Sequence, residues 1–324
     1  MNRTGPRCLF ALTLLTAGIA LTACQKCGPS SDRPTGAIEK KYYAQGPWAV
    51  TDDLGSQKYC CDSQNNHFDL IYPTNLGANG FSHPIITWGN GTLGSAKGAK
   101  YFLDHLASWG FVIIATQDQF TGPGQTILDA ANFLVKENNT DTTSIFYHKL
   151  NTAQIGAVGH SQGAGGAANA LIKSGGTIKT VIPIELPAQM WCTLPPCLDT
   201  KNLTSGSVFF IDGSADLLVS PPFQLPNVTG LQSIDAYYNA VPAGVPKLKG
   251  TLICPNHNDI TGQPDCSAAA QPCVVGVYGY LGYPTAWFMD TLQGDAYAHS
   301  AFVTGTGEIF SQPKNWQHVA SNIH

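Results

Sequence analysis

Charged residues are scarce in this sequence. Lys, Arg, Asp and Glu make up 12% of the 324 residues, and the formal net charge is −4. There is no basic cluster or long charge run, and nucleic-acid binding depends on concentrated Lys and Arg. We therefore expect no nucleic acid as a partner. Coiled-coil heptads, solenoid repeats and low-complexity tails are missing too, whereas 43% hydrophobic residues over this length suffice for one large core.

A long stretch without charge lies at the N-terminus. Arg3 and Arg7 precede residues 8–23, which contain no charged side chain. That length suits the apolar region and cleavage segment of a signal peptide and is short for a membrane-spanning helix. The stretch ends in Leu21-Thr22-Ala23-Cys24, which resembles a bacterial lipobox. We therefore expect residues 1–23 to be a lipoprotein signal peptide.

In such signals, cleavage precedes the cysteine, whose sulfur then carries a diacylglycerol. Cys24 is accordingly the expected lipid carrier and membrane anchor; the alternative is an ordinary signal peptide with a chance cysteine and a secreted product. Gln25, rather than Asp, suits the outer membrane if the organism is Gram-negative. Residues 24–40, rich in Gly, Pro and Ser, predict a flexible tether, so that the folded domain spans residues 41–324.

Cysteine usage agrees with export. Eight cysteines remain after Cys8 and Cys24 are set aside: Cys27, Cys60, Cys61, Cys192, Cys197, Cys254, Cys266 and Cys273. An even number in an oxidising compartment favours disulfides. We predict only one pair, Cys192 with Cys197, because a Thr-Leu-Pro-Pro turn separates them. A zinc site is the rival hypothesis, but the adjacent Cys60-Cys61 and the absence of paired Cys-x-x-Cys units argue against it.

From about residue 67, short apolar runs alternate with helical patterns, which is typical of a mostly parallel twisted sheet flanked by helices. The expected strands are residues 69–72, 84–88, 111–115, 153–158, 180–184, 207–211 and 248–252. The expected helices are residues 97–109 and 125–136, with others near 230–240 and 284–293. No segment is long enough for a separate lid domain, so any active site should be open at the carboxyl ends of the strands.

The motif Gly159-His160-Ser161-Gln162-Gly163 follows one of these strands and precedes a run of small residues. A strand, a sharp Gly-x-Ser-x-Gly turn and a helix form the nucleophile elbow of α/β-hydrolases. Ser161 is therefore the candidate nucleophile. His160, which precedes it, is expected to have a packing or supporting role.

A serine hydroxyl needs a base and an orienting acid, and in this fold they follow the serine in the order acid, then histidine. We select Asp216 over Asp212 because it lies in the loop beyond a strand, where it has more reach. We select His257 over His299 because it directly follows an apolar strand, while His299 follows the last expected helix. His318 and His324 lie further downstream.

An oxyanion hole requires two backbone N–H donors. Gln162, the residue after the nucleophile, is expected to supply one. The other is expected from the loop Trp88-Gly89-Asn90-Gly91-Thr92, where the choice between Asn90 and Thr92 stays open. No metal or organic cofactor is needed for this chemistry.

The sequence also resembles bacterial cutinase-like polyester hydrolases, the group that includes PET-degrading enzymes. The likeness rests on Tyr-Ala-Gln-Gly-Pro at residues 43–47, Tyr-Pro-Thr at 72–74, Leu-Ala-Ser-Trp-Gly-Phe-Val at 106–112, Ser-Ala-Asp at 214–216 and Asn-His at 256–257. It implies an α/β-hydrolase fold and a substrate-contacting role for Trp191, whose alternative role is packing beside the disulfide. Gly91 is the other candidate substrate contact. The family's loop is usually Pro-Gly-aromatic-Thr, whereas this one is Trp-Gly-Asn-Gly-Thr, without the aromatic clamp. Gln162 stands where the family often has Met.

These features predict an exported serine carboxylester hydrolase that forms an acyl-enzyme. The expected substrate is an ester of short or medium acyl chain, with polymeric esters included by the resemblance. Two alternatives stay open: an acyltransferase or peptidase with the same triad, and a surface lipoprotein that keeps the fold for binding.

Overall fold

The computed structural model describes residue 27, residues 33–311 and residues 314–324. Within these residues the chain forms a nine-stranded sheet in the order β1-β2-β4-β3-β5-β6-β7-β8-β9. The strands are β1 (Val50–Asp53), β2 (Phe68–Pro73), β3 (His83–Gly89), β4 (Val112–Thr116), β5 (Leu150–His160), β6 (Ile178–Ile184), β7 (Ser207–Gly213), β8 (Lys247–Leu252) and β9 (Trp316–Ser321). Pairing is parallel from β4 through β8 and antiparallel at both edges of the sheet.

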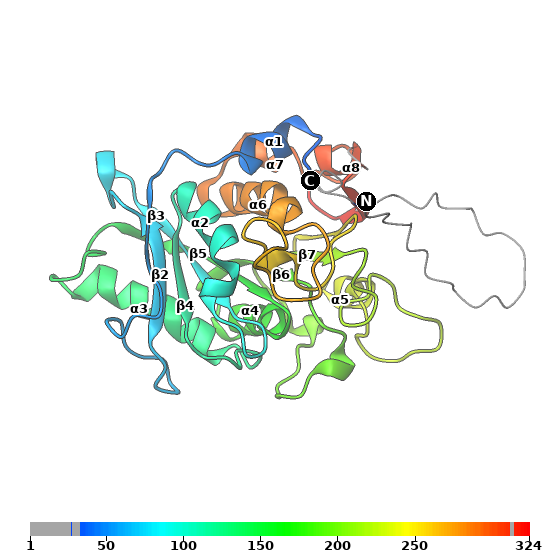
Figure 1. Cartoon of the computed structure of the whole chain (residues 1–324), viewed down its shortest axis with the longest axis horizontal. Coiled ribbons are helices and arrows are strands. Elements are labelled where there is room, and N and C mark those ends of the chain that lie inside the picture. Colours follow the sequence, from blue (N-terminus) through cyan, green and yellow to red (C-terminus); the bar gives the residue numbers. More distant parts are fainter. Residues whose placement is uncertain (1–26, 28–32, 312–313) are drawn as a thin grey trace, which may run out of the picture.

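Helices cover both faces of the sheet (Figure 1). They are α1 (Ala37–Tyr43), α2 (Lys100–Ser108), α3 (Gln125–Thr140), α4 (Gln162–Lys173), α5 (Ile234–Ala240), α6 (Gly282–Gln293), α7 (Ala296–His299) and α8 (Glu308–Ser311). Side chains of α1, α2 and α6 pack in one hydrophobic core, and those of α3, α4 and α5 pack in a second. The predicted α/β-hydrolase architecture is confirmed.

The alternation of side chains along the central strands explains why two cores form. In β4, Val112 and Ile114 pack on the side of α3 and α4, whereas Ile113 and Ala115 pack on the side of α2 and α6. Successive side chains of a strand point to opposite faces, so a strand covered on both faces must be apolar throughout. Burial of each large aliphatic side chain contributes about 1.5–3 kcal/mol.

The helix α1 corrects the predicted boundary of the tether. It begins at Ala37, inside the segment 24–40 that was expected to be flexible. The carboxylate of Glu308 accepts hydrogen bonds from the backbone N–H groups of Ile38 and Glu39, each at 2.9 Å. The Glu39 carboxylate is itself buried and accepts a 2.7 Å hydrogen bond from the indole of Trp316. Contacts with residues far along the chain thus order this segment, so the folded part begins before residue 41.

None of the helices in the described part of the chain combines the length and apolar character needed to cross a membrane. The expected signal peptide, residues 1–23, and the expected lipid carrier Cys24 lie outside the described residues.

Candidate active site

Ser161 occupies a sharp turn between β5 and α4. Its backbone has φ 56° and ψ −126°, a left-handed conformation that is unfavourable for any residue other than glycine. The turn is closely packed and needs a residue without a side chain at Gly163, because a Cβ there would overlap the carbonyl oxygen of Gly89. The Ser161 N–H donates to the carbonyl of Ile184 at 3.0 Å. These contacts hold the hydroxyl at the carboxyl edge of the sheet and at the N-terminus of α4.

Ser161, His257 and Asp216 are joined by hydrogen bonds. The Ser161 Oγ lies 2.8 Å from His257 Nε2, and His257 Nδ1 lies 2.6 Å from Asp216 Oδ2. Asp216 also accepts a hydrogen bond from the Val219 N–H at 3.1 Å. Burial alone would raise the pKa of the Asp216 carboxyl, but the hydrogen bond from His257 and its charge hold that pKa below the ordinary value. The structure therefore brings together the three residues that the sequence selected.

The competing acid and base lie elsewhere. Asp212 is fully buried within β7, and its Oδ1 accepts a 2.8 Å hydrogen bond from the Thr251 hydroxyl. Burial raises the pKa of Asp212 to about 8. His299 ends α7 and lies 3.2 Å from Asp290, on a cavity that contains none of the three residues joined above.

His160 supports the segment that carries His257. Its Nε2 lies 2.7 Å from the His257 carbonyl oxygen, and the two rings are 4.9 Å apart. Burial, and next the charge of His257, lower the pKa of His160 to about 3. A neutral imidazole can therefore donate its Nε2 hydrogen to this carbonyl. This contact agrees with the supporting role predicted from the sequence.

The glycine-rich loop after β3 has one part that is buried and one part that faces Ser161. Asn90 is 1% exposed, and its side-chain amide donates to the carbonyls of Thr116 and Asp118 at 2.8 and 3.0 Å. A Cβ on Gly91 would lie 3.4 Å from the Ser161 Cβ, and Thr92 lines the cavities on both sides of Ser161. The side chain of Asn90 thus fixes the loop from behind, while Gly91 and Thr92 face the hydroxyl.

Two cavities meet at Ser161 and His257. The first, of about 400 Å³, is mainly apolar, and its walls include Leu186, Trp191, Leu198, Val219 and Tyr237. The second, of about 330 Å³, is lined by smaller residues of the Gly91 loop and of the segment after His257. Trp191 is 45% exposed, and its indole N–H donates to the Leu218 carbonyl at 3.1 Å. Its position in the cavity wall favours a substrate contact over packing alone.

The cysteines of the described chain pair in four disulfides: Cys27–Cys254, Cys60–Cys61, Cys192–Cys197 and Cys266–Cys273. The one pair that the sequence predicted, Cys192–Cys197, is bonded and lines the larger cavity. Among the described residues there are three groups of potential metal ligands, and within each group the ligand atoms lie within 4.8 Å of one another. Two of them depend on disulfide sulfurs, and the third is Glu185 with Asp216 and His257.

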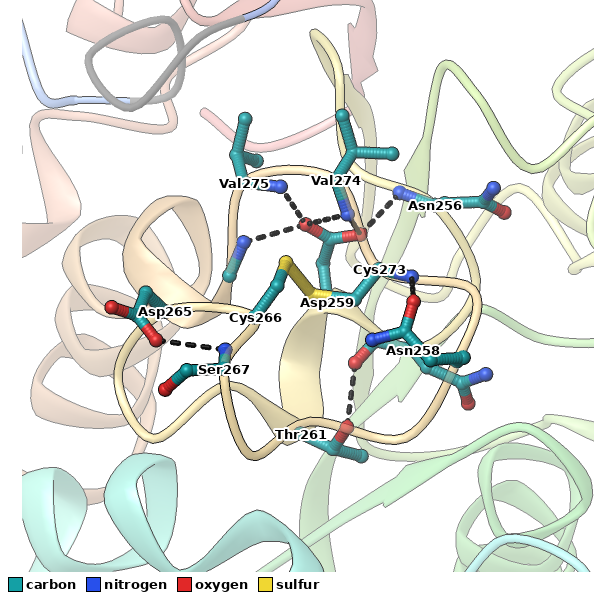
Figure 2. Close-up of a disulfide and its surroundings, with 12 residues drawn as sticks. Asn256, Asn258, Asp259, Thr261, Asp265, Cys266, Ser267, Cys273, Val274 and Val275 are labelled. Carbon is teal, nitrogen blue, oxygen red and sulfur yellow. Dashed lines mark hydrogen bonds between the residues drawn. A yellow bond between two sulfur atoms is a disulfide. The ribbon is translucent and has the colours of Figure 1, made fainter. Parts of the chain in front are cut away.

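His257 lies on a segment with little regular structure. Cys254 ties its start to Cys27. Further along, Cys266 and Cys273 are bonded to one another (Figure 2). Between them, the buried carboxylate of Asp259 accepts backbone N–H groups of Asn256, Val274, Val275 and Gly276 at 2.6–3.1 Å (Figure 2). Asp259 thus holds both ends of the loop that carries the imidazole.

Sequence reasoning missed both Asp259 and Glu185. No sequence motif marks Asp259, because its carboxylate oxygens accept hydrogen bonds from backbone N–H groups up to 17 residues away. Glu185 did leave a signal: it is the first charged residue after the apolar strand β6, at the edge where Ser161 also lies.

A family model described as PETase, PET hydrolase-like, matches residues 29–193, slightly more than half of the chain. The chain belongs to the PET hydrolase-like family. Membership in the PET hydrolase-like family confirms the resemblance to polyester hydrolases and supports an ester hydrolase. The PET hydrolase-like match contains Ser161 and the Gly91 loop but ends before Asp216 and His257. A comparison with curated proteins found no match.

Proposed function

We propose that this protein is a serine carboxylester hydrolase that acts through an acyl-enzyme. The observation that carries the proposal is the unbroken hydrogen-bonded series from Ser161 through His257 to Asp216, which opens onto an apolar cavity. A strained serine at a helix N-terminus, a histidine within reach and a buried carboxylate behind it are the parts that acyl transfer to serine requires.

The reaction has two stages. The Ser161 Oγ attacks the ester carbonyl carbon while its proton passes to His257 Nε2. Asp216 holds the imidazole and stabilises its protonated form. The tetrahedral oxyanion then collapses, and His257 returns the proton to the departing alcohol. Water, deprotonated by the same imidazole, releases the acid and restores the serine.

The oxyanion is held by two backbone N–H groups in this proposal. The first is that of Gln162, the first residue of α4, where the helix dipole also favours negative charge. The second comes from the Gly91–Thr92 part of the loop. The side chain of Asn90 shapes this loop through its hydrogen bonds to two buried carbonyls.

The larger cavity supports an acyl group of short or medium length, or an aromatic one. Its volume of about 400 Å³ and its apolar walls suit such a group. The loops after β3, β6 and β7, which contribute Thr92, Trp191 and Val219 to its walls, expose large apolar side chains: Leu93, Met190, Trp191, Leu217, Leu218 and Leu225. Residues 217–234 contain no charged side chain. This uncharged rim supports a polymeric ester as a further substrate.

An acyl-chain-length series of p-nitrophenyl esters tests the function. We expect the highest kcat/KM for short or medium chains, and a loss of roughly 10⁴-fold or more in Ser161→Ala. Efficient acyl transfer to added alcohols, or peptide cleavage in preference to ester cleavage, would instead support the acyltransferase or peptidase alternatives. A wild-type protein that binds these esters without turnover would support the binding alternative.

We further propose that the protein is exported and anchored through a lipid on Cys24. The support is the uncharged run 8–23 that ends in Leu-Thr-Ala-Cys. Mass spectrometry of the N-terminal peptide should find a diacylglyceryl cysteine, and Cys24→Ser should release the protein from membranes. An unmodified N-terminus beyond residue 24 would show secretion without an anchor.

A further inference from the structure

Glu185 lies directly behind the proposed catalytic residues. It follows the last residue of β6, Ile184, whose carbonyl accepts the Ser161 N–H. The Glu185 side chain is 0% exposed, and its backbone has φ 50°, so the fold maintains an unfavourable conformation at this position. Its own N–H donates to the Ile211 carbonyl at 2.8 Å, in the strand that leads to Asp216. The residue therefore links the turn of the nucleophile to the loop of the acid.

The carboxyl group of Glu185 is held by a buried tyrosine. Its Oε1 accepts a 2.5 Å hydrogen bond from the hydroxyl of Tyr280, which is equally buried. Its Oε2 is buried without a hydrogen-bond partner among the residues that the structure describes. One oxygen of Glu185, one of Asp216 and one ring nitrogen of His257 all lie within 4.8 Å of one another. The mechanism proposed above gives this group no role.

Two ionised carboxylates cannot lie so close in a dry site without strong repulsion. Asp216 has the compensation that a charge needs, because His257 and the Val219 N–H both donate to it. Glu185 lacks an ionised donor, and burial, then the charges of Asp216 and Asp212, raise the pKa of its carboxyl well above the ordinary value. Of the two groups, Glu185 is therefore the one that keeps its proton.

We infer that Glu185 is a positioning residue for the hydrolytic reaction: it faces Asp216 with a neutral hydroxyl group and leaves Asp216 as the single anion that orients His257. The inference rests on the proposed function. The titratable groups that face Glu185 are Asp212 and Asp216 from β7 and its loop, His257 from the segment after β8, and Tyr280 from the residues before α6. His160 and Asp259 reach the same cluster through Asp216 and Tyr280.

The test compares Glu185→Gln with Glu185→Leu. Gln keeps a neutral group of the same shape with an acceptor for Tyr280 and a donor toward Asp216, whereas Leu has neither. We expect Glu185→Gln to retain kcat within about threefold and Glu185→Leu to lose about 10- to 100-fold in kcat with little change in KM. Equal activity of the two variants would overturn the inference, since filling the space would then suffice.

The pH profile of kcat/KM gives a readout that a purely structural role would not move. Its acidic limb reports protonation of the base in the free enzyme. Replacing a neutral acid by a neutral amide leaves the midpoint of that limb in place, whereas removing a negative charge at this distance would lower it by about one pH unit or more. A lowered midpoint in Glu185→Gln would show that Glu185 is ionised and would overturn the inference even if Glu185→Leu fails to fold.

Asp212→Asn is the matched control, because Asp212 is another fully buried carboxyl group at the same edge of the sheet, in β7, but lies outside the group formed with His257. The acidic limb of the kcat/KM profile of Asp212→Asn should coincide with that of the wild type. Ser161→Ala, measured in parallel, distinguishes failure of the proposed function from failure of the inference about Glu185. If Ser161→Ala stays active, the proposed function is wrong. If Ser161→Ala is inactive but the Glu185 variants do not behave as expected, only the inference is wrong.

Discussion

The Ser161 Oγ and the His257 Nε2 lie 2.8 Å apart, but the segments that carry these two residues are built in different ways. Ser161 sits between a central strand and a helix, in a turn fixed by close backbone packing between glycines. His257 sits in a segment of turns and short helical pieces, tied by two disulfides and by the carboxylate of Asp259. The nucleophile is therefore positioned by the core itself, whereas the base is positioned by a few specific cross-links.

This contrast predicts different consequences of damage. A change in the serine turn must disturb the sheet, so stability and activity should fall together. A change in the base segment should reduce activity while the sheet and its two cores persist, because local opening of such segments costs less than global unfolding.

The largest effect is expected for Gly163→Ala, since the added Cβ would overlap the Gly89 carbonyl oxygen. We expect a loss of about 3 kcal/mol in the free energy of unfolding and nearly complete loss of esterase activity. Gly165→Ala is the control on the same helix, because its Cβ would meet only Leu186, at 3.7 Å. There, alanine should raise stability by about 0.5–1 kcal/mol. Urea unfolding measures both, and equal stability of the two variants would contradict the close packing.

Next in size is Asp259→Asn in the base segment. The amide nitrogen of the variant would face backbone N–H groups that donate to the carboxylate in the wild type. We therefore expect a loss of about 2 kcal/mol in the free energy of unfolding. Displacement of His257 by about 1 Å should lower kcat about 10- to 100-fold while the far-ultraviolet circular dichroism stays unchanged. Asp265→Asn, on an exposed residue of the same segment, is the control and should leave both unchanged. Full activity in Asp259→Asn would mean that the disulfides alone position the base.

The sequence predicted the serine side of the site better than the base side for the same physical reason. The Gly159–Gly163 turn, the preceding strand and the helix that follows are local, so spacing and residue type suffice to identify them. Asp216 and His257 were selected by their position after apolar strands, which is also local information. The fold class likewise followed from the alternation of apolar runs and helical patterns.

What could not be predicted depends on long-range contacts. The bond from Cys27 to Cys254 joins residues 227 positions apart, and Glu308 orders the start of α1 from 270 positions away. Nothing in the local sequence of residues 24–40 announces these partners, so composition alone suggested a flexible tether. Glu185 was missed because its importance lies in what surrounds it after folding.

Removing the Cys266–Cys273 disulfide compares the two sides of the substrate site. Loop-closure entropy gives about 2 kcal/mol for such a short loop, and nearly the same for Cys192–Cys197. We expect Cys266→Ser/Cys273→Ser to lower kcat for all esters, because it loosens the segment of the base. Cys192→Ser/Cys197→Ser should instead change the preference for acyl-chain length, because that pair lines the larger cavity. Kinetics over the p-nitrophenyl ester series separates the two, and identical patterns would contradict the division of roles.

The smallest effect at neutral pH is expected for His160→Gln, at the contact between the two regions. The Gln amide can still donate to the His257 carbonyl, so both proteins should be equally stable and active at pH 7–8. The pKa of His160 is about 3 in the folded protein against an ordinary value of 6.5, so between these values the unfolded chain binds a proton that the folded protein does not. The free energy of unfolding therefore falls as the pH falls through this window, and His160 contributes about 1.4 kcal/mol per pH unit to that fall. Urea unfolding from pH 7 to pH 4 should give a shallower decline for His160→Gln. The same slope in both proteins would mean that His160 does not stay neutral in the fold, and that the link between the serine turn and the base segment does not depend on its charge.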